Sequence, residues 1–276
     1  MRVFSTDDVS LELHDLGGEG PTLLIAHATG FCAGAYRPLA DHLGPRFHVW
    51  AVDFRGHGDA TLPTGGDLTW RGMVDDVLAV VAALDDGPVF AVGHSMGGAC
   101  LLAAEHRVPG TLRAAYVFEP IVVPADFAAM TGRNPMAESA RRRRPGFPTR
   151  LDALARYASR PPLGTFRADA LAAYVEHGFA DAADGTVVLK CLPESEARTF
   201  EADAKPLISQ MDTITIPVVV ARGFRDRSPG PGAFAAAIAE TLPNGALVAY
   251  NHLSHFGPFQ DPDTIAEDII AAFLPG

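Results

Sequence analysis

Short apolar runs alternate with longer helix-like segments along most of this chain of 276 residues, and this rhythm strongly constrains its fold. Two alternating runs come first and predict a β-hairpin around Asp7 and Asp8. The compact apolar runs that follow are typical of strands buried on both faces. They lie at 22–28, 47–53, 89–93, 114–120, 216–224 and 246–251, with helices expected near 36–44, 69–86, 97–107, 232–242 and 261–274. The pattern predicts the α/β class, with a mostly parallel central sheet and helices on both faces.

The rhythm stops after Pro120 and resumes near residue 216. The intervening segment contains helix-like pieces near 134–144, 149–160 and 167–179, separated by proline and glycine. We therefore expect a core formed by residues 1–123 and 206–276, and a helical cap formed by residues 124–205. In open α/β folds ligands bind at the carboxyl edge of the sheet, so the cap is expected to cover that edge.

Composition excludes several classes of partner. The formal charge of −11 gives no basic surface for nucleic acid or anionic lipid. No run is apolar and long enough to span a bilayer, and the first residues show no secretory signal. The three cysteines are far apart and lack metal-ligand spacing. We expect a cytoplasmic protein with a small-molecule substrate, no nucleic-acid or membrane partner, no metal and no cofactor; the sequence does not specify the oligomeric state.

The segment "VFAVGHSMGGAC", residues 89–100, surrounds one serine with glycines. Glycine is needed where two backbones nearly touch or where the chain adopts angles that other residues rarely take. An apolar run precedes this serine, Ser95, and a helix-like stretch follows it. The pattern predicts a sharp turn from strand to helix that exposes the Ser95 hydroxyl as a nucleophile.

A serine nucleophile needs a histidine base, and the base needs a carboxylate. Asp226 follows the expected strand at 216–224, and His255 follows the expected strand at 246–251. We predict these two residues as acid and base; His252 is expected to be a loop or packing residue. Asp226 could instead pair with a neighbouring arginine or cap a turn. Glu119, at the end of another expected strand, is the alternative acid, a substrate contact, or a cap of that strand end.

The reaction also creates an oxyanion, which backbone N–H groups must stabilise. The N–H of Met96, directly after the nucleophile, is one expected donor. The N–H of Thr29, in the loop after the first core strand, is the other. That loop could also be a simple glycine-containing turn.

These segments together resemble the α/β-hydrolase family with an inserted cap. The resemblance rests on "HATGF" from His27, "DFRGHG" from Asp53, "GHSMGG" from Gly93, "GFRD" from Gly223 and "HFGPFQDP" from His255, in this order along the chain. It implies the same nucleophile, acid, base and oxyanion donors. It also implies that His27, Asp53, Arg55 and His57 support loop geometry. The chain departs from many relatives at Ala28, where they carry glycine.

Serine at the turn points to acyl transfer to water and away from the family branches that use aspartate there. We expect a serine hydrolase acting on a small to medium apolar carboxylic ester or lactone. A carbon–carbon bond hydrolase, a cofactor-free perhydrolase, and a small-molecule receptor with vestigial hydrolysis remain alternatives. Aromatic residues of the cap could line the substrate pocket or form the cap's own core; these are Phe127, Phe147, Tyr157, Phe166, Tyr174 and Phe179. The run Arg141–Arg144 is expected to be a solvated helix face.

Overall fold

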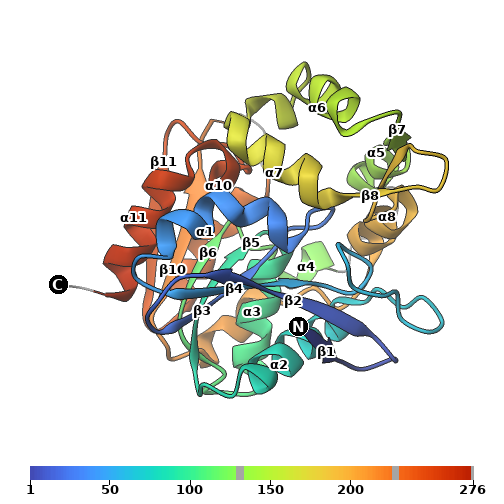
Figure 1. The fold of residues 1–276 in the computed structure, drawn as a ribbon. Coiled ribbons are helices and arrows are strands. Elements are labelled where there is room, and N and C mark those ends of the chain that lie inside the picture. Colours follow the sequence, from blue (N-terminus) through green and yellow to red (C-terminus); the bar gives the residue numbers. More distant parts are fainter. Residues whose placement is uncertain (129–133, 226–229, 275–276) are drawn as a thin grey trace.

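An eight-stranded sheet forms the centre of the computed structural model, which describes residues 1–128, 134–225 and 230–274 (Figure 1). The strand order is β1-β2-β4-β3-β5-β6-β10-β11; the β1–β2 and β2–β4 pairs are antiparallel and the other pairs are parallel. The strands are β1 (Arg2–Phe4), β2 (Ser10–Gly17), β3 (Thr22–Ala26), β4 (His48–Asp53), β5 (Val89–His94), β6 (Leu112–Phe118), β10 (Val218–Gly223) and β11 (Gly245–Tyr250). The expected hairpin and mostly parallel sheet are both present.

Burial on both faces explains the continuous apolar runs. In β3, Leu23 and Ile25 enter one hydrophobic core, whereas Leu24 and Ala26 enter the other. Because successive side chains of a strand point to opposite faces, a strand between two helical layers needs apolar residues at every position.

Helices cover both faces of the sheet. Apolar side chains of α1 and α11 join the first core, and those of α2, α3 and α9 join the second. The helices are α1 (Arg37–Leu43), α2 (Trp70–Leu84), α3 (Met96–Arg107), α9 (Ala235–Thr241), α10 (Gly257–Gln260) and α11 (Pro262–Phe273), with short 3-10 turns at η1 (Ala33–Tyr36), η3 (Ile208–Thr213) and η4 (Pro231–Phe234). None of the helices in the described part of the chain combines the length and apolar character needed to cross a membrane.

Strand register brings the expected site segments to one edge. Gly93 of β5 pairs with Ala26 of β3 on one side and with Val117 of β6 on the other, and Phe118 of β6 pairs with Ala221 of β10. These strands are parallel, so the residues that follow them all emerge at the same carboxyl edge.

The turn after β5 depends on two close backbone approaches. A Cβ on Gly93 would overlap the Cα of Gly98, and a Cβ on Gly97 would overlap the carbonyl oxygen of Ala26 in β3. Only glycine lets α3 start this close to the sheet. Between them Ser95 takes φ 55° and ψ −116°, angles that are rare for a residue with a side chain. The expected sharp turn from strand to helix is therefore present.

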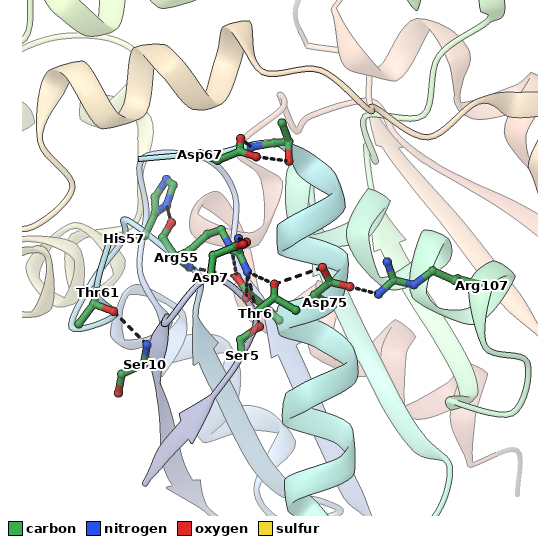
Figure 2. Close-up of polar contacts among 12 residues, drawn as sticks. Ser5, Thr6, Asp7, Ser10, Arg55, His57, Thr61, Asp67, Asp75 and Arg107 are labelled. Carbon is green, nitrogen blue, oxygen red and sulfur yellow. Dashed lines mark hydrogen bonds and ion pairs between the residues drawn. The ribbon is translucent and has the colours of Figure 1, made fainter. Parts of the chain in front are cut away.

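A buried arginine ties the N-terminal hairpin to the sheet. The guanidinium of Arg55, in the loop after β4, pairs with buried Asp76 of α2 at 2.8 Å. Figure 2 shows that it also donates to Asp7 and Thr6 in the hairpin turn, at 3.0 Å each. Several acceptors offset the cost of burying this charge.

The segment of residues 124–205, between β6 and β10, contains a further group of helices, most of which lie together at one end of the molecule (Figure 1). Its helices are α4 (Ala125–Ala128), α5 (Pro135–Arg141), α6 (Arg150–Ala158), α7 (Ala168–Gly178) and α8 (Pro193–Glu201), with the 3-10 turn η2 (Leu163–Thr165). It also contains a three-stranded antiparallel sheet, which the sequence analysis missed: β7 (Gly146–Phe147), β9 (Val187–Leu189) and β8 (Phe179–Asp181). These strands are too short to show alternation. We call this segment the cap.

The cap is attached to the core at several points. Its two ends meet, because Val123 and Leu207 form a parallel bridge. The indole of Trp70 in α2 donates to the carbonyl of Thr199 at 3.0 Å, and the ammonium of Lys190 contacts Asp59 at 2.8 Å. The cap therefore rests on the core loops as well as on its own two connections.

The glycine contacts at the turn after β5 predict that alanine at position 97 destabilises the protein more than alanine at position 178 does. Gly97→Ala is expected to lower the free energy of unfolding by about 2 kcal/mol, because the new methyl group meets backbone atoms that cannot move independently. Gly178→Ala is the control, since its methyl group would meet Tyr174 at an ordinary 3.5 Å. Urea unfolding of both variants measures the difference; equal stabilities would contradict the steric explanation.

Candidate active site

Ser95 lies at the centre of the carboxyl edge of the sheet. Its backbone N–H donates to the carbonyl of Phe118 at 2.9 Å, and its own carbonyl accepts from Ile121 at 3.2 Å. These bonds anchor the strained turn to the loop after β6. Since Ser95 precedes α3, its side chain also lies at the positive end of a helix dipole, which favours negative charge on the hydroxyl oxygen.

His255 and Glu119 form a hydrogen-bonded pair beside this turn. The Nδ1 atom of His255 lies 2.7 Å from a carboxylate oxygen of Glu119, and the other oxygen accepts the N–H of Gly223 at 2.9 Å. Glu119 is buried and has φ 44°, so it sits in a strained turn like Ser95. This carboxylate can hold the imidazole with Nδ1 protonated and Nε2 available as a base.

Asp226, the acid predicted from the sequence, lies outside the described residues. It follows β10, whose last residue, Gly223, binds Glu119. Glu119, the alternative acid of the sequence analysis, has a contact with His255 that lies within the described residues.

The loop after β3 forms a tight turn next to Ser95. Phe31 N–H donates to the Ala28 carbonyl at 3.1 Å, with Gly30 at φ 81°. The N–H of Ala28 is taken by the hydroxyl of Tyr36 at 3.1 Å, so this residue is not a free donor. The Thr29 hydroxyl lies 3.3 Å from the sulfur of Met96, which brings the two residues predicted as oxyanion donors together.

Buried polar groups of Asp53 and His27 hold this loop in place through hydrogen bonds. Asp53 accepts from the backbone of Ala33 at 2.7 Å and from Asp59 at 2.9 Å, and it contacts His14 at 2.8 Å. His27 reaches the Ala28 carbonyl at 2.8 Å through Nδ1. These contacts fit the supporting role that the resemblance implies for residues of these motifs.

His57 is neutral as well as buried. Burial lowers its pKa to about 3, and its Nδ1 atom lies 3.1 Å from the carbonyl of Arg55. Within the described residues, its Nε2 atom has no hydrogen-bond partner. His57 packs against His27, with ring centroids 5.1 Å apart and the two rings tilted by 49°.

The cap aromatics make two sets of contacts, which are joined where Tyr157 packs against Tyr174 at 5.9 Å. Phe147, Tyr157 and Phe179 pack against one another within the cap, with centroids 5.7 to 6.2 Å apart. Phe166 and Tyr174 instead face Phe31 in the loop after β3, at 6.1 and 5.1 Å. The side chain of Phe127 lies outside the described part of the structure.

An aromatic group therefore connects the cap with the candidate base. Phe166 lies 5.5 Å from the ring of Phe256, and Phe256 lies 5.4 Å from the ring of His255. Together with Phe31, these residues form an apolar cluster beside the candidate base.

Arg143 departs from the solvated face expected for its arginine run. Its guanidinium pairs with Glu196 of α8 and donates to the hydroxyl of Tyr174. A Cβ on Gly30 would lie 2.6 Å from the Glu196 carboxylate and 3.3 Å from Arg143. A charged pair of the cap thus packs directly on the loop after β3. Sequence alone does not distinguish Arg143 from its three neighbours.

The alpha/beta hydrolase family model matches residues 23–268 of this chain. The chain belongs to the alpha/beta hydrolase family. The match spans the sheet from β3 and continues to α11, so it includes every candidate site residue and the cap. The expected alpha/beta hydrolase fold is confirmed.

Two curated proteins resemble this chain to different extents. The chain is 34% identical over 124 residues to protein phosphatase methylesterase 1 of Mus musculus, a match that spans only 32% of that protein and 39% of this chain. It is 28% identical over 226 residues to 2-(acetamidomethylene)succinate hydrolase of Mesorhizobium japonicum, covering 81% of this chain and 76% of that protein.

Solved hydrolase structures show the same fold. A crystal structure of E-2-(acetamidomethylene)succinate hydrolase superimposes with a TM-score of 0.79, covers 99% of this chain and 97% of that one, and is 22% identical. The likeness extends over the cap as well as the sheet.

The His14–Asp53 contact predicts a pH-dependent stability. The hydrogen bond to Asp53 raises the pKa of His14 above its usual 6.5, although burial opposes the shift. This stabilisation is therefore complete below pH 6.5 and is lost as the pH rises through the raised pKa. His14→Gln should lower the free energy of unfolding by about 1 kcal/mol more at pH 5.5 than at pH 8.5.

His48→Gln is the matched control for that measurement. His48 contacts Asp15 at 2.9 Å, but both side chains are largely solvated, and exposed pairs contribute little. Urea unfolding at the two pH values compares the variants. If the free energy of unfolding changed equally with pH in both variants, the buried carboxylate of Asp53 would not be the cause of the pH dependence.

Conservative variants can show which of the two candidate acids, Glu119 or Asp226, orients His255. If Glu119 orients His255, Glu119→Gln should lower kcat by about 10²-fold to 10⁴-fold, because the amide no longer stabilises the imidazolium. Asp226→Asn should change kcat by less than about tenfold. Steady-state kinetics of the two folded variants measures the ranking; the reverse order would return the acid role to Asp226.

Proposed function

We propose that this member of the alpha/beta hydrolase family is a serine hydrolase that cleaves a small to medium apolar carboxylic ester or lactone. The observation that carries the proposal is the His255–Glu119 pair at 2.7 Å, on the same sheet edge as the strained turn of Ser95. A buried carboxylate, an imidazole and a serine at the carboxyl edge of the sheet are the groups that acyl transfer needs.

The reaction follows from these groups. The Ser95 oxygen attacks the substrate carbonyl while its proton passes to Nε2 of His255, and Glu119 stabilises the resulting imidazolium through Nδ1–H. The N–H groups of Thr29 and Met96 bind the oxyanion. The imidazolium then gives its proton to the leaving alcohol, which leaves an acyl group on Ser95. Water, deprotonated by His255, attacks this ester and releases the acid and the free serine.

The surroundings support an apolar acyl or alcohol group. Phe31, Phe166 and Phe256 lie within 6.2 Å of one another by ring centroids, next to His255. Aromatic walls with few polar groups bind small apolar ligands.

A second candidate is hydrolysis of an N-acyl bond in a small unsaturated acid. It is favoured by the similarity to 2-(acetamidomethylene)succinate hydrolase, which extends over 81% of this chain. The same serine, base and oxyanion donors serve ester and amide carbonyls alike, so only the substrate distinguishes the two candidates.

The test compares the wild type with Ser95→Ala on p-nitrophenyl esters from acetate to decanoate, and on 2-(acetamidomethylene)succinate. The wild type should be most active on short esters, and Ser95→Ala should lower kcat by at least about 10³-fold. Product release is followed by absorbance and by chromatography.

Each other outcome selects a different function. Activity on the N-acyl acid alone would replace the ester proposal by the second candidate. A vinylogous diketone is assayed in parallel, and its turnover without esterase activity would identify a carbon–carbon bond hydrolase. Equal activity of wild type and Ser95→Ala would exclude the serine mechanism.

A further inference from the structure

A chain of buried hydrogen bonds links the parts of the candidate site to one another. The N–H of Ala28, in the loop after β3, donates to the hydroxyl of Tyr36 at 3.1 Å. That hydroxyl lies 2.8 Å from Nδ1 of His94, the last residue of β5. Nε2 of His94 lies 2.7 Å from the backbone carbonyl of His255. Tyr36 and His94 are both about 1% exposed, so water does not compete for these contacts.

The groups at the two ends determine where each proton lies. The backbone N–H of Ala28 can only donate, and the carbonyl of His255 can only accept. His94 must therefore carry its proton on Nε2 and accept at Nδ1 from the hydroxyl of Tyr36. Every polar atom in this series of hydrogen bonds then has a partner, and the imidazole of His94 is neutral. Burial, together with nearby His255, keeps the pKa of His94 well below its usual value, which agrees with this state.

The rings around His94 prevent it from turning. Its centroid lies 5.0 Å from the ring of His255, 5.7 Å from Phe259 and 6.0 Å from Phe118. Tyr36 is held in the same way, with its ring 4.8 Å from Phe259. The hydrogen bonds are therefore built from rigid groups on three separate segments.

We propose that Tyr36 and His94 are positioning residues, which set the distance between the oxyanion loop and the candidate base through this hydrogen-bond chain. The inference rests on the proposed function, because that function assigns the oxyanion loop and His255 their chemical roles. Neither residue touches the reacting atoms. His94 directly precedes the nucleophile in sequence. Its side chain therefore connects the segment of Ser95 with the backbone of His255 and, through Tyr36, with the oxyanion loop.

Loss of the Tyr36 hydroxyl has two consequences. The Ala28 N–H and Nδ1 of His94 are left buried without a partner, which is costly. His94 can then move its proton to Nδ1 and lose its bond to the His255 carbonyl. Both the oxyanion loop and the base shift relative to Ser95, and displacements of about 1 Å can cost about 10²-fold in rate.

The kinetic test compares Tyr36→Phe with Tyr116→Phe. Tyr116 is also a fully buried tyrosine, and its hydroxyl contacts that of Tyr250 at 2.7 Å. Within the described residues, the hydroxyls of Tyr116 and Tyr250 do not contact the candidate site residues. With the best ester substrate, Tyr36→Phe should lower kcat by about 10-fold to 100-fold and change KM by less than about threefold. Tyr116→Phe should leave kcat within about twofold of the wild type.

A spectroscopic test is independent of catalysis and so separates this inference from the proposed function. Long-range ¹H–¹⁵N spectra of histidine-labelled protein report which imidazole nitrogen carries the proton, and Ser95→Ala is a suitable background. We expect His94 as the Nε2–H tautomer in that protein, and a changed His94 signal after Tyr36→Phe. His94→Gln, which can donate to the His255 carbonyl and accept from Tyr36, should retain more activity than His94→Leu. An Nδ1–H tautomer in the parent protein, or equal kcat for Tyr36→Phe and Tyr116→Phe, would overturn the inference.

Discussion

The close approach of α3 to strands β3 and β5 is the constraint on which the candidate site depends. Gly97 lies against the carbonyl of Ala26, and Gly93 lies against Gly98, so the helix begins almost in contact with the sheet. This proximity forces the intervening residue, Ser95, into a conformation that a chain of L-residues rarely adopts. It also places the Met96 N–H at the start of a helix next to the loop after β3. The nucleophile and both predicted oxyanion donors therefore depend on the same backbone contacts.

The electrostatics of the site single out one histidine. His27, His57 and His94 are fully buried, and burial lowers the pKa of each. Their hydrogen bonds are met by neutral groups, namely backbone carbonyls, a backbone N–H and a tyrosine hydroxyl. His255 differs because its Nδ1 atom faces a carboxylate. Positive charge is thus disfavoured at the three fully buried imidazoles, whose partners carry no charge.

Much of this arrangement could be predicted from the sequence, because parallel strands deliver all their following loops to one edge. Counting strands predicts that Ser95, His255 and the loop of Thr29 all follow strands at this one edge. The partner of His255 was harder to predict, since Glu119 lies 136 positions away and both Glu119 and Asp226 follow strands of the same sheet. Tyr36 gave no signal at all, because a tyrosine in an apolar turn looks like an ordinary core residue. Arg143 was misjudged because burial depends on tertiary packing that a run of like residues does not encode.

The bridge between Val123 and Leu207 closes the cap into a loop with both ends at one place on the core. The Val123 backbone exchanges hydrogen bonds with Pro206 and Ile208 at 3.0 Å each, so the two connecting strands of chain leave and return side by side. The length of the inserted segment is then decoupled from the register of the central sheet. Evolution can lengthen, shorten or replace such an inserted segment, and so change the side chains that pack on the core loops, while the sheet edge that carries the candidate site keeps its dimensions.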